Sequence, residues 1–298
     1  MRDATSDIRQ LDLRPDDEPV ASWEVGDVRV TRVVEGISEF PRGFLPDLTD
    51  ERIEACGEWV GPYVRDDLRR LLLSTHSFVV ETPESIVVVD TCVGAHIVRP
   101  MRSDPTFGDR LAAAIPGGPD AVDVVICTHL HFDHVGWNTW WNGDQWVPTF
   151  RRARHLVSVE EYEATVADDH MEVMEPSVAP LREAGLLDVV PSDHRVDGCL
   201  RLQPSPGHSP GHVCVEIESG GRRALITGDA THSPLQFVYP DVSAVHADDD
   251  SALATRTRER LVADLADTDV VVLGTHFPTP TAGLVRRTMR GLVRFDAV

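Results

Sequence analysis

The sequence predicts a mixed α/β protein with stacked sheets, in which strands end in loops that carry histidine or aspartate. Short apolar segments of strand length recur along the chain between segments with helical features. Four of these apolar segments lead to histidine or aspartate, at His129, His208, Asp229 and His276. Because loops at strand ends gather at one edge of a stacked sheet, we expect these four places to form a single site.

Length and composition permit a folded core of this kind. The chain has 298 residues, of which 42% are hydrophobic, enough for one large domain or two small ones. Residues 1–20 are polar and acidic and contain two prolines. We expect them to form a tail or arm outside the site, and residues 21–298 to form a single domain.

In the first half of the chain, alternating apolar residues predict two hairpins, at Trp23–Glu35 and at Ser77–Glu81 with Ile86–Asp90. Thr49 is expected to cap a short helix. The other expected elements are an apolar, proline-broken loop at Gly36–Asp50, an amphipathic or irregular piece at Asp66–Leu73, a helix around Asp109–Ala114 and a buried strand at Val124–Cys127. The loop either borders a pocket or packs over the core.

In the second half, the charged segment Glu160–Ala184 is expected to be mostly helical, with two prolines interrupting it. Its charges predict a solvated face or a lid, and we assign no chemistry to Glu160, Glu161 or Glu163. The other expected elements are strands at His155–Val159, Asp188–Val190, Cys199–Leu202, Val213–Ile217, Arg223–Thr227 and Val270–Leu273, and helices at Asp250–Asp267 and from about Thr281.

The stretch His129–His134 contains three histidines and one aspartate in six positions. It follows the buried strand Val124–Cys127, so these side chains leave the tip of a strand within one tight loop. Groups placed in this way can converge on a metal ion instead of spreading over a surface.

Five imidazoles and two carboxylates are enough to fill two metal positions and still leave room for water and substrate. The seven groups belong to His129, His131, Asp133, His134, His208, Asp229 and His276. This donor set suits two Zn²⁺ ions, although Mn²⁺, Fe²⁺ and Co²⁺ remain alternatives. We expect a hydroxide between two cations roughly 3.5–4 Å apart to attack a carbonyl carbon or a phosphorus atom, so that no side-chain nucleophile is needed.

The net charge of −21 disfavours a nucleic-acid partner and favours a small neutral or weakly charged substrate. The five cysteines form no CxxC pair and are expected to be reduced core residues. We find no apolar segment typical of a signal peptide or a membrane span, and therefore expect a cytoplasmic protein with no membrane partner.

In its order and spacing, the series His129-x-His131-x-Asp133-His134, His208, Asp229, His276 resembles the metallo-β-lactamase fold superfamily. The resemblance covers the chain from about Val25 to its end and implies a four-layer αβ/βα sandwich. It also implies that His129, His131 and His208 bind one metal, that Asp133, His134 and His276 bind the second, and that Asp229 bridges them. Asp90 matches a strand-end aspartate behind the ligands.

Within this superfamily the chain is most similar to the lactonase and organophosphate-hydrolase branch, which includes N-acyl homoserine lactonases and methyl parathion hydrolase. The resemblance implies a zinc-dependent enzyme that opens lactones or cleaves esters of small apolar molecules. The alternatives are a phosphotriesterase or arylesterase, a glyoxalase II-like thioesterase and, less favoured, a metal-dependent oxidoreductase or a binding protein without turnover. A homodimer is implied by the branch alone.

The chain departs from the lactonases at one position, where His232 replaces a tyrosine three residues after the bridging aspartate. His232 is either a surface or supporting residue, or it hydrogen bonds to the substrate carbonyl or protonates the leaving oxygen. We count it and Asp133 as candidate catalytic residues. His212 is expected to satisfy buried backbone. The remaining histidines are treated as ordinary: His76, His96, His155, His170, His194 and His246.

Three tryptophans follow the metal-binding stretch. Trp137, Trp140 and Trp141 are spaced so that all three lie on one face if this piece is helical. They either pack in the core or form a wall of the substrate pocket.

Overall fold

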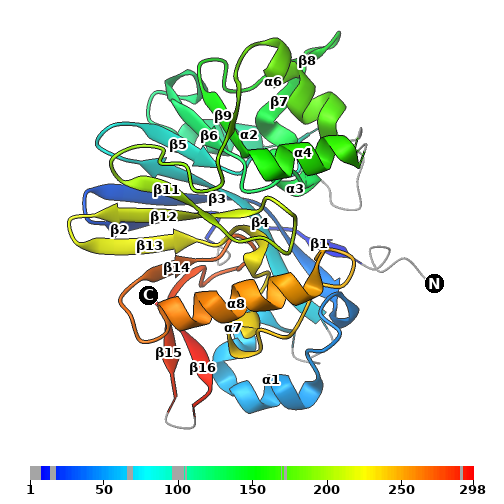
Figure 1. The fold of residues 1–298 in the computed structure, drawn as a ribbon, viewed down its shortest axis with the longest axis vertical. Coiled ribbons are helices and arrows are strands. Elements are labelled where there is room, and N and C mark those ends of the chain that lie inside the picture. Colours follow the sequence, from blue (N-terminus) through cyan, green and yellow to red (C-terminus); the bar gives the residue numbers. More distant parts are fainter. Residues whose placement is uncertain are drawn as a thin grey trace.

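The computed structural model describes residues 8–13, 18–65, 70–95, 104, 106–168, 170, 173–288 and 291–298. Two large sheets lie face to face, and helices cover the outer side of each (Figure 1). This arrangement confirms the predicted four-layer αβ/βα sandwich. His96 and residues 66–69 of the expected piece Asp66–Leu73 lie outside the described residues.

The first sheet has eight strands in the order β1-β3-β4-β5-β6-β9-β10, with β2 also paired to β3. Its strands are β1 (Arg9–Leu11), β2 (Val20–Val25), β3 (Val28–Pro41), β4 (Arg70–Glu81), β5 (Ile86–Val89), β6 (Val124–Ile126), β9 (Arg154–Ser158) and β10 (Leu187–Val190). The pairings β5–β6, β6–β9 and β9–β10 are parallel, and the others are antiparallel. Both predicted hairpins are therefore confirmed, as β2–β3 and β4–β5.

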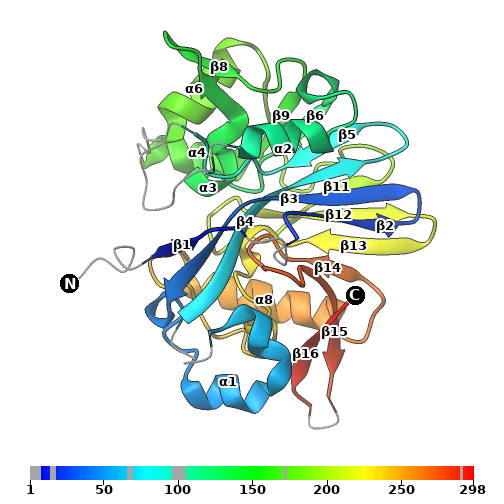
Figure 2. The same cartoon turned by 180° about the vertical axis from the view of Figure 1, so that it is seen from behind.

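The second sheet has six strands in sequence order, and only the pairing of β13 with β14 is parallel. Its strands are β11 (Leu200–Pro204), β12 (Val213–Ser219), β13 (Arg222–Ile226), β14 (Val271–Leu273), β15 (Ala282–Arg287) and β16 (Val293–Ala297). A separate hairpin is formed by β7 (Thr139–Trp141) and β8 (Trp146–Pro148). Figure 2 shows the two sheets from the opposite side.

Helices cover both outer faces. The α-helices are α1 (Asp50–Cys56), α2 (Phe107–Ala114), α3 (Phe132–Val135), α4 (Val159–Ala167), α6 (Ala179–Glu183), α7 (Leu235–Val238) and α8 (Ser251–Leu265). A π-helical turn spans η7 (Met174–Val178), and short 3₁₀ turns are η3 (Arg42–Phe44), η4 (Glu58–Tyr63), η5 (Pro119–Ala121), η6 (Gly136–Asn138) and η8 (Gly228–Ala230). Thr49 caps α1 as predicted, since its side chain accepts a hydrogen bond from the Arg52 N–H.

The core is divided among the layers. Apolar side chains from both sheets, such as Val30, Val80 and Val215, meet in the middle. Phe107 of α2 packs on the outer face of the first sheet, and Leu261 of α8 packs on that of the second. Strands that are buried on both faces, such as β5, β6 and β14, are short continuous apolar runs, which is why they could be recognised in the sequence.

The segment from Trp137 to Trp141 does not form one continuous helix. Trp137 lies in η6, whereas Trp140 and Trp141 lie in β7 and are partly exposed, at 45% and 38%. The Trp141 ring contacts Trp146 across the hairpin, with centroids 5.5 Å apart. Aromatic residues favour such cross-strand pairs, so Trp140 and Trp141 do not share a helical face with Trp137.

The helix expected from about Thr281 is also wrong, because Ala282–Arg287 forms β15. This strand pairs with β14 on one side and with β16 on the other. Its buried residues, including Val285, extend the core under α8, so tertiary packing decides its conformation. Similarly, Arg70–Leu73 belongs to β4, and the loop expected at Gly36–Asp50 begins as strand, because β3 continues to Pro41.

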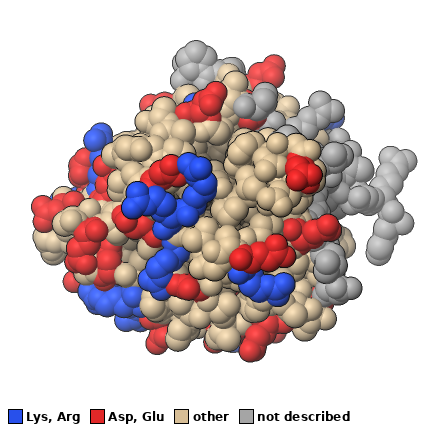
Figure 3. Space-filling view, turned by 90° about the horizontal axis from the view of Figure 1, so that it is seen from above, with Lys and Arg blue, Asp and Glu red and all other residues tan. Residues whose placement is uncertain are grey.

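Basic and acidic side chains are interspersed on the face shown in Figure 3, where arginines lie next to aspartates and glutamates. Within the described ranges, no helix has both the length and the apolar composition that crossing a bilayer requires.

Candidate metal centre

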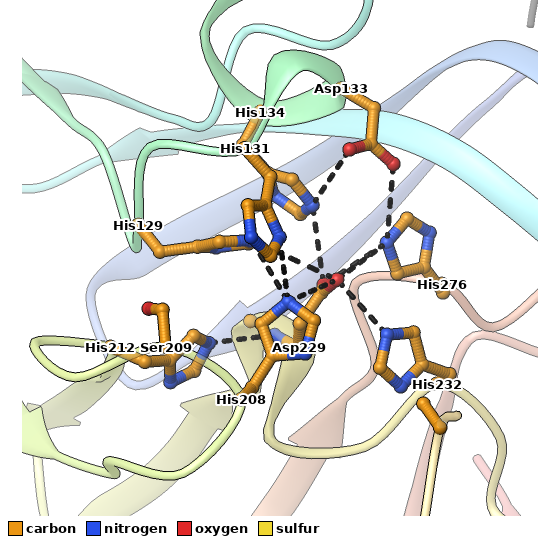
Figure 4. Close-up of polar contacts among 12 residues, drawn as sticks. His129, His131, Asp133, His134, His208, Ser209, His212, Asp229, His232 and His276 are labelled. Carbon is orange, nitrogen blue, oxygen red and sulfur yellow. Dashed lines mark hydrogen bonds and ion pairs between the residues drawn. The ribbon is translucent and has the colours of Figure 1, made fainter. Parts of the chain in front are cut away.

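The loops at the ends of several strands meet at one edge of the sandwich (Figure 4). His129 and His131 follow β6, Asp229 follows β13 and His276 follows β14. The structure brings these residues together with the three others predicted as ligands, which are Asp133, His134 and His208. They remain predicted ligands, and their geometry shows how well they suit a metal.

His129, His131 and His208 form what we call the first trio. Nε2 of His208 lies 3.2 Å from Nε2 of His129 and 2.9 Å from Nδ1 of His131. Nitrogens that share a tetrahedral Zn²⁺ at 2.0–2.1 Å are about 3.3 Å apart. The first trio therefore has a spacing close to that of three zinc ligands.

Asp133, His134 and His276 form the second trio, which is wider. Oδ1 of Asp133 lies 3.8 Å from Nε2 of His134, and Oδ2 of Asp133 lies 3.8 Å from Nε2 of His276. Asp229 lies between the trios: Oδ2 is 3.3 Å from Nε2 of His208, and Oδ1 is 3.0 Å from Nε2 of His276. One carboxylate thus faces both sets of imidazoles.

Each trio has hydrogen-bond partners that orient its rings. The Nδ1–H of His134 donates to Asp90, 2.9 Å away, and that of His276 donates to the Ser74 carbonyl, also 2.9 Å away. In the first trio, His208 Nδ1 lies 3.3 Å from Asp248. Because Nδ1 carries the hydrogen in these three rings, Nε2 presents a lone pair to the centre.

The predicted place of Asp90 behind the ligands matches these contacts. Besides its bond to His134, Asp90 accepts hydrogen bonds from the N–H and the hydroxyl of Thr128, both at 2.8 Å. It therefore ties the second trio to the residue before His129. Asp90 has a φ of +56°, a sparsely populated backbone region for a non-glycine residue.

Two atoms indicate directly that a cation fits this centre. Nε2 of His134 and Oδ1 of Asp229 are buried and have no hydrogen-bond partner among the described residues, yet they lie 3.3 Å apart. With the His134 hydrogen on Nδ1, both atoms are acceptors and would repel each other. A cation bound to both removes this conflict, as does a proton on His134.

The pKa values of the histidines also differ between the two trios. Burial and the neighbouring imidazoles lower the pKa of His129 and His131 well below the ordinary value. Burial also opposes charge on His134, but Asp229, Asp90 and Asp133 outweigh it and raise the pKa of His134 well above the ordinary value. His129 and His131 therefore favour the neutral imidazole, whereas His134 favours the positively charged one.

A cavity of about 280 Å³ opens beside the centre, and most of its lining surface is apolar. Ligand residues such as Asp133 and Asp229 line one side. The apolar residues are Ile8, Phe40, Phe44, Leu73, Phe132 and Ala247. Phe40 and Phe44 confirm that the segment expected at Gly36–Asp50 borders a pocket, while Leu45 and Leu48 of the same segment are buried in the core.

Ile8 corrects the expectation that the first 20 residues lie outside the site. Arg9–Leu11 pairs with β3 as an edge strand, which places Ile8 at the cavity. Its polar surroundings in the sequence gave no indication of this contact.

His232 lies at the wall of the same cavity, beside the centre. Its Nε2 is 3.2 Å from Oδ2 of Asp229, and its ring is parallel to that of His276, with centroids 5.5 Å apart. Burial lowers the pKa of His232. The position suits a group that contacts substrate, and its role in the reaction stays a prediction.

His212 has the backbone role predicted for it. Its Nε2 accepts a hydrogen bond from the Asp229 N–H at 2.8 Å, and so holds the carboxylate in place. A Cβ on the preceding Gly228 would lie 2.4 Å from that nitrogen, so this position has no room for a side chain. The histidine treated as ordinary that does line the cavity is His246.

Two supporting residues were not identified from the sequence. Asp248 contacts His208 and forms a buried ion pair with Arg258, at 3.2 Å. Glu161, expected on a solvated face, is only 3% exposed and accepts hydrogen bonds from both loops of the first trio. Asp248 occurs in a run of three aspartates and Glu161 in a charged helix, and neither context indicates burial.

The fold and the site together define a metallo-hydrolase. The chain belongs to the metallo-beta-lactamase superfamily, whose family model matches residues 70–276. The resemblance inferred from the seven predicted ligands is thereby confirmed.

Curated relatives include lactonases and probable metallo-hydrolases. The N-acyl homoserine lactonase AiiA of Bacillus thuringiensis subsp. kurstaki is 27% identical over 184 residues, which cover 56% of this chain and 68% of AiiA. A probable metallo-hydrolase of Mycobacterium tuberculosis is 28% identical over 181 residues, covering 54% of this chain and 57% of the relative.

Solved structures share the fold over nearly the whole chain. The hydrolase AbOPH of the beta lactamase superfamily has a TM-score of 0.78 and 21% identity, covering 94% of this chain and 97% of its own. AidC, a dizinc quorum-quenching lactonase, has a TM-score of 0.72 and 19% identity with the same coverage. At these identities the likeness shows the fold alone.

Proposed function

We propose that the chain is a dinuclear zinc hydrolase that opens lactones or cleaves esters of small apolar molecules. The observation that carries the proposal is the meeting of seven predicted ligand groups next to a largely apolar cavity. Two of these groups, His134 and Asp229, present buried acceptor atoms without a hydrogen-bond partner among the described residues. The lactonases among the relatives favour a lactone or ester as substrate.

In this proposal the first trio holds one cation, the second trio holds the other, and Asp229 contacts both. When bound, the two cations lower the pKa of water to near neutrality and polarise the carbonyl of the substrate. Asp229 and Asp133 offset their charge. Asp90 and the Ser74 carbonyl keep the hydrogens of His134 and His276 on Nδ1.

The cavity determines what fits. Phe44 and Phe132 present apolar surface next to Asp133, and about 280 Å³ admits a small acyl or aryl group. His232 is placed to donate a hydrogen bond to the carbonyl or leaving oxygen. The proposed partner is thus a small molecule and not a nucleic acid or a membrane. We further propose a cytoplasmic location. We also propose a homodimer, which analytical ultracentrifugation would test.

A second candidate is the hydrolysis of aryl esters or phosphotriesters. Three phenylalanines among the lining residues favour it, because aromatic rings pack well against an aryl leaving group. His232, which replaces the lactonase tyrosine, is compatible with either substrate class.

The test is a panel of acyl lactones, aryl esters, phosphotriesters and thioesters, assayed with zinc-loaded protein and with His129→Ala as the control. We expect turnover of lactones or aryl esters that depends on His129, with about two zinc ions per chain by elemental analysis. Turnover no higher than that of the control on every substrate would refute the proposal. Preference for glutathione or coenzyme A thioesters would indicate the thioesterase, and bound iron with oxygen consumption an oxidoreductase.

A further inference from the structure

Glu161 is a buried carboxylate that joins the two loops supplying the first trio. Its side chain extends from the first turn of α4, and the residue is 3% exposed. Oε1 accepts a hydrogen bond from the Leu130 N–H at 2.9 Å. Oε2 accepts two more, from the Ser209 hydroxyl at 2.6 Å and from the Gly211 N–H at 3.1 Å.

The donors of these hydrogen bonds are next to the predicted ligands in the chain. Leu130 lies between His129 and His131, and Ser209 directly follows His208. The two loops come from different sheets, one after β6 and the other between β11 and β12. One carboxylate therefore fixes the gap across which His131 and His208 face each other at 2.9 Å.

The second loop is also packed closely against α4. The Ser158 hydroxyl donates to the Gly211 carbonyl at 2.6 Å and accepts from the Glu161 N–H at 3.2 Å. A Cβ on Gly211 would lie 2.0 Å from the Glu161 nitrogen. The first turn of α4 thus determines where the loop carrying His208 can lie.

We infer that Glu161 is a positioning residue that sets the spacing of His131 and His208, and with it the affinity of the first trio for a cation. This inference rests on the proposed metal-dependent function. Glu161 makes its contacts to backbone and to Ser209, so it acts through the ligands. Residues that orient ligands in this way typically change metal affinity or activity by about 10- to 100-fold when substituted.

Glutamine is a sharp probe of this role, because it keeps the shape of the side chain and changes its hydrogen-bonding capacity. A carboxylate accepts all three hydrogen bonds, whereas glutamine has one acceptor oxygen and an NH₂ group that only donates. If its oxygen accepts from Leu130, its NH₂ group faces the Gly211 N–H, a donor. The bond from Gly211 is then lost, and the loop carrying His208 keeps only the Ser209 hydroxyl, which must turn from donor to acceptor.

The experiment compares Glu161→Gln with Glu160→Gln and Glu163→Gln, which remove the same charge from exposed positions on the same helix. Metal-depleted proteins are titrated with Co²⁺ alone, followed by visible absorption and by competition with a chelator, and thermal unfolding is measured in parallel. We expect Glu161→Gln to weaken one of the two Co²⁺ equivalents by about 10- to 100-fold and to change its spectrum. Both control variants should bind Co²⁺ like the wild type.

Ser209→Ala provides a milder variant in case Glu161→Gln does not fold, since it removes one hydrogen bond and keeps the other two. It should weaken the same Co²⁺ equivalent by a few-fold. Wild-type affinity and spectrum in the folded variants, even with a lower melting temperature, would overturn the inference and assign Glu161 a purely structural role. An equal loss in the exposed controls would also overturn it. If the wild type itself binds no Co²⁺, the proposed function fails.

Discussion

The two trios of the metal centre share Asp229 but differ in charge and in the groups behind them. The first trio consists of imidazoles, and Asp248 behind His208 is itself paired with the Arg258 guanidinium. The second trio contains a carboxylate, and among the described residues the Asp90 carboxylate behind His134 has the neutral Thr128 as its other hydrogen-bond partner. The second trio is therefore in the more negative environment.

If the proposed dinuclear centre forms, this difference predicts that the loops at one sheet edge provide two unlike metal positions. The first trio contains no carboxylate and is already spaced like zinc ligands, at 2.9 and 3.2 Å. The second is wider and attracts a cation mainly by charge, through Asp133, Asp229 and Asp90. Imidazole favours Zn²⁺, whereas carboxylate also suits Mn²⁺, so we expect the second position to be the less selective.

The largest effect should come from Asp229, the residue that serves both trios. Asp229→Ala removes the charge that offsets both cations, and we expect kcat/KM to fall by at least about 10³-fold, with less than two metal ions retained. Asp229→Asn keeps one acceptor oxygen and should lose less. Activity assays with elemental analysis measure both effects, and full metal occupancy in Asp229→Ala would contradict a shared role.

Asp90→Asn and Asp248→Asn test the trios separately. Asp90→Asn should weaken the cation of the second trio by about 10- to 100-fold, since His134 loses its charged partner. Asp248→Asn should weaken that of the first trio and also lower the free energy of unfolding by about 3 kcal/mol, because Arg258 remains buried without its partner. Chelator competition and denaturant unfolding distinguish the two. Identical metal-binding changes in both variants would contradict separate positions.

An effect on kcat smaller than that of Asp229→Ala is expected at His232, which contacts Asp229 but belongs to neither trio. His232→Phe keeps the ring and removes the hydrogen bonds, so kcat should fall by roughly 10²-fold if the side chain assists the reaction. The metal content should stay at the wild-type level. His232→Tyr restores a donor and should recover part of kcat. A loss of metal in His232→Phe would instead make His232 a ligand, as its 3.2 Å distance from Asp229 permits.

The sequence predicted the donor groups of this centre because each stands where an apolar strand ends. His129, Asp229 and His276 are chemically distinctive residues next to strands, and parallel or stacked strands must bring their ends to a common edge. This information is local, so no knowledge of distant contacts was needed. The four-layer sandwich, by contrast, was implied by the resemblance to the metallo-β-lactamase superfamily that these residues carry.

The groups that support the ligands could not be predicted in this way, because their partners are distant. Glu161 bonds to the N–H of Leu130 and to Ser209, which lie 31 and 48 positions away. Its spacing from Ser158 is that of a capping box, in which the glutamate would bond back to its own helix. Likewise, the residues near Thr281 do not indicate that Ala282–Arg287 will pair with β14 and β16, and a helix was therefore expected there.

His155 offers the smallest test, and it isolates burial from the neighbouring charges that act on the trios. Burial lowers the pKa of His155 to about 4, compared with about 6.5 in an unfolded chain. Between pH 6.5 and 4 the unfolded chain takes up a proton that the folded protein rejects, so stability is lost as the pH falls, by about 3 kcal/mol in total.

Above pH 6.5 this residue makes no difference, since it is neutral in both states. His155→Phe should therefore be less sensitive to acid than the wild type, while the other histidines cancel in the difference between the two proteins. Denaturant unfolding of both metal-depleted proteins at pH 7.5 and pH 4.5 measures it. Equal losses in the two would mean that His155 is protonated in the folded state, and that burial alone does not explain the lowered pKa values of His129 and His131.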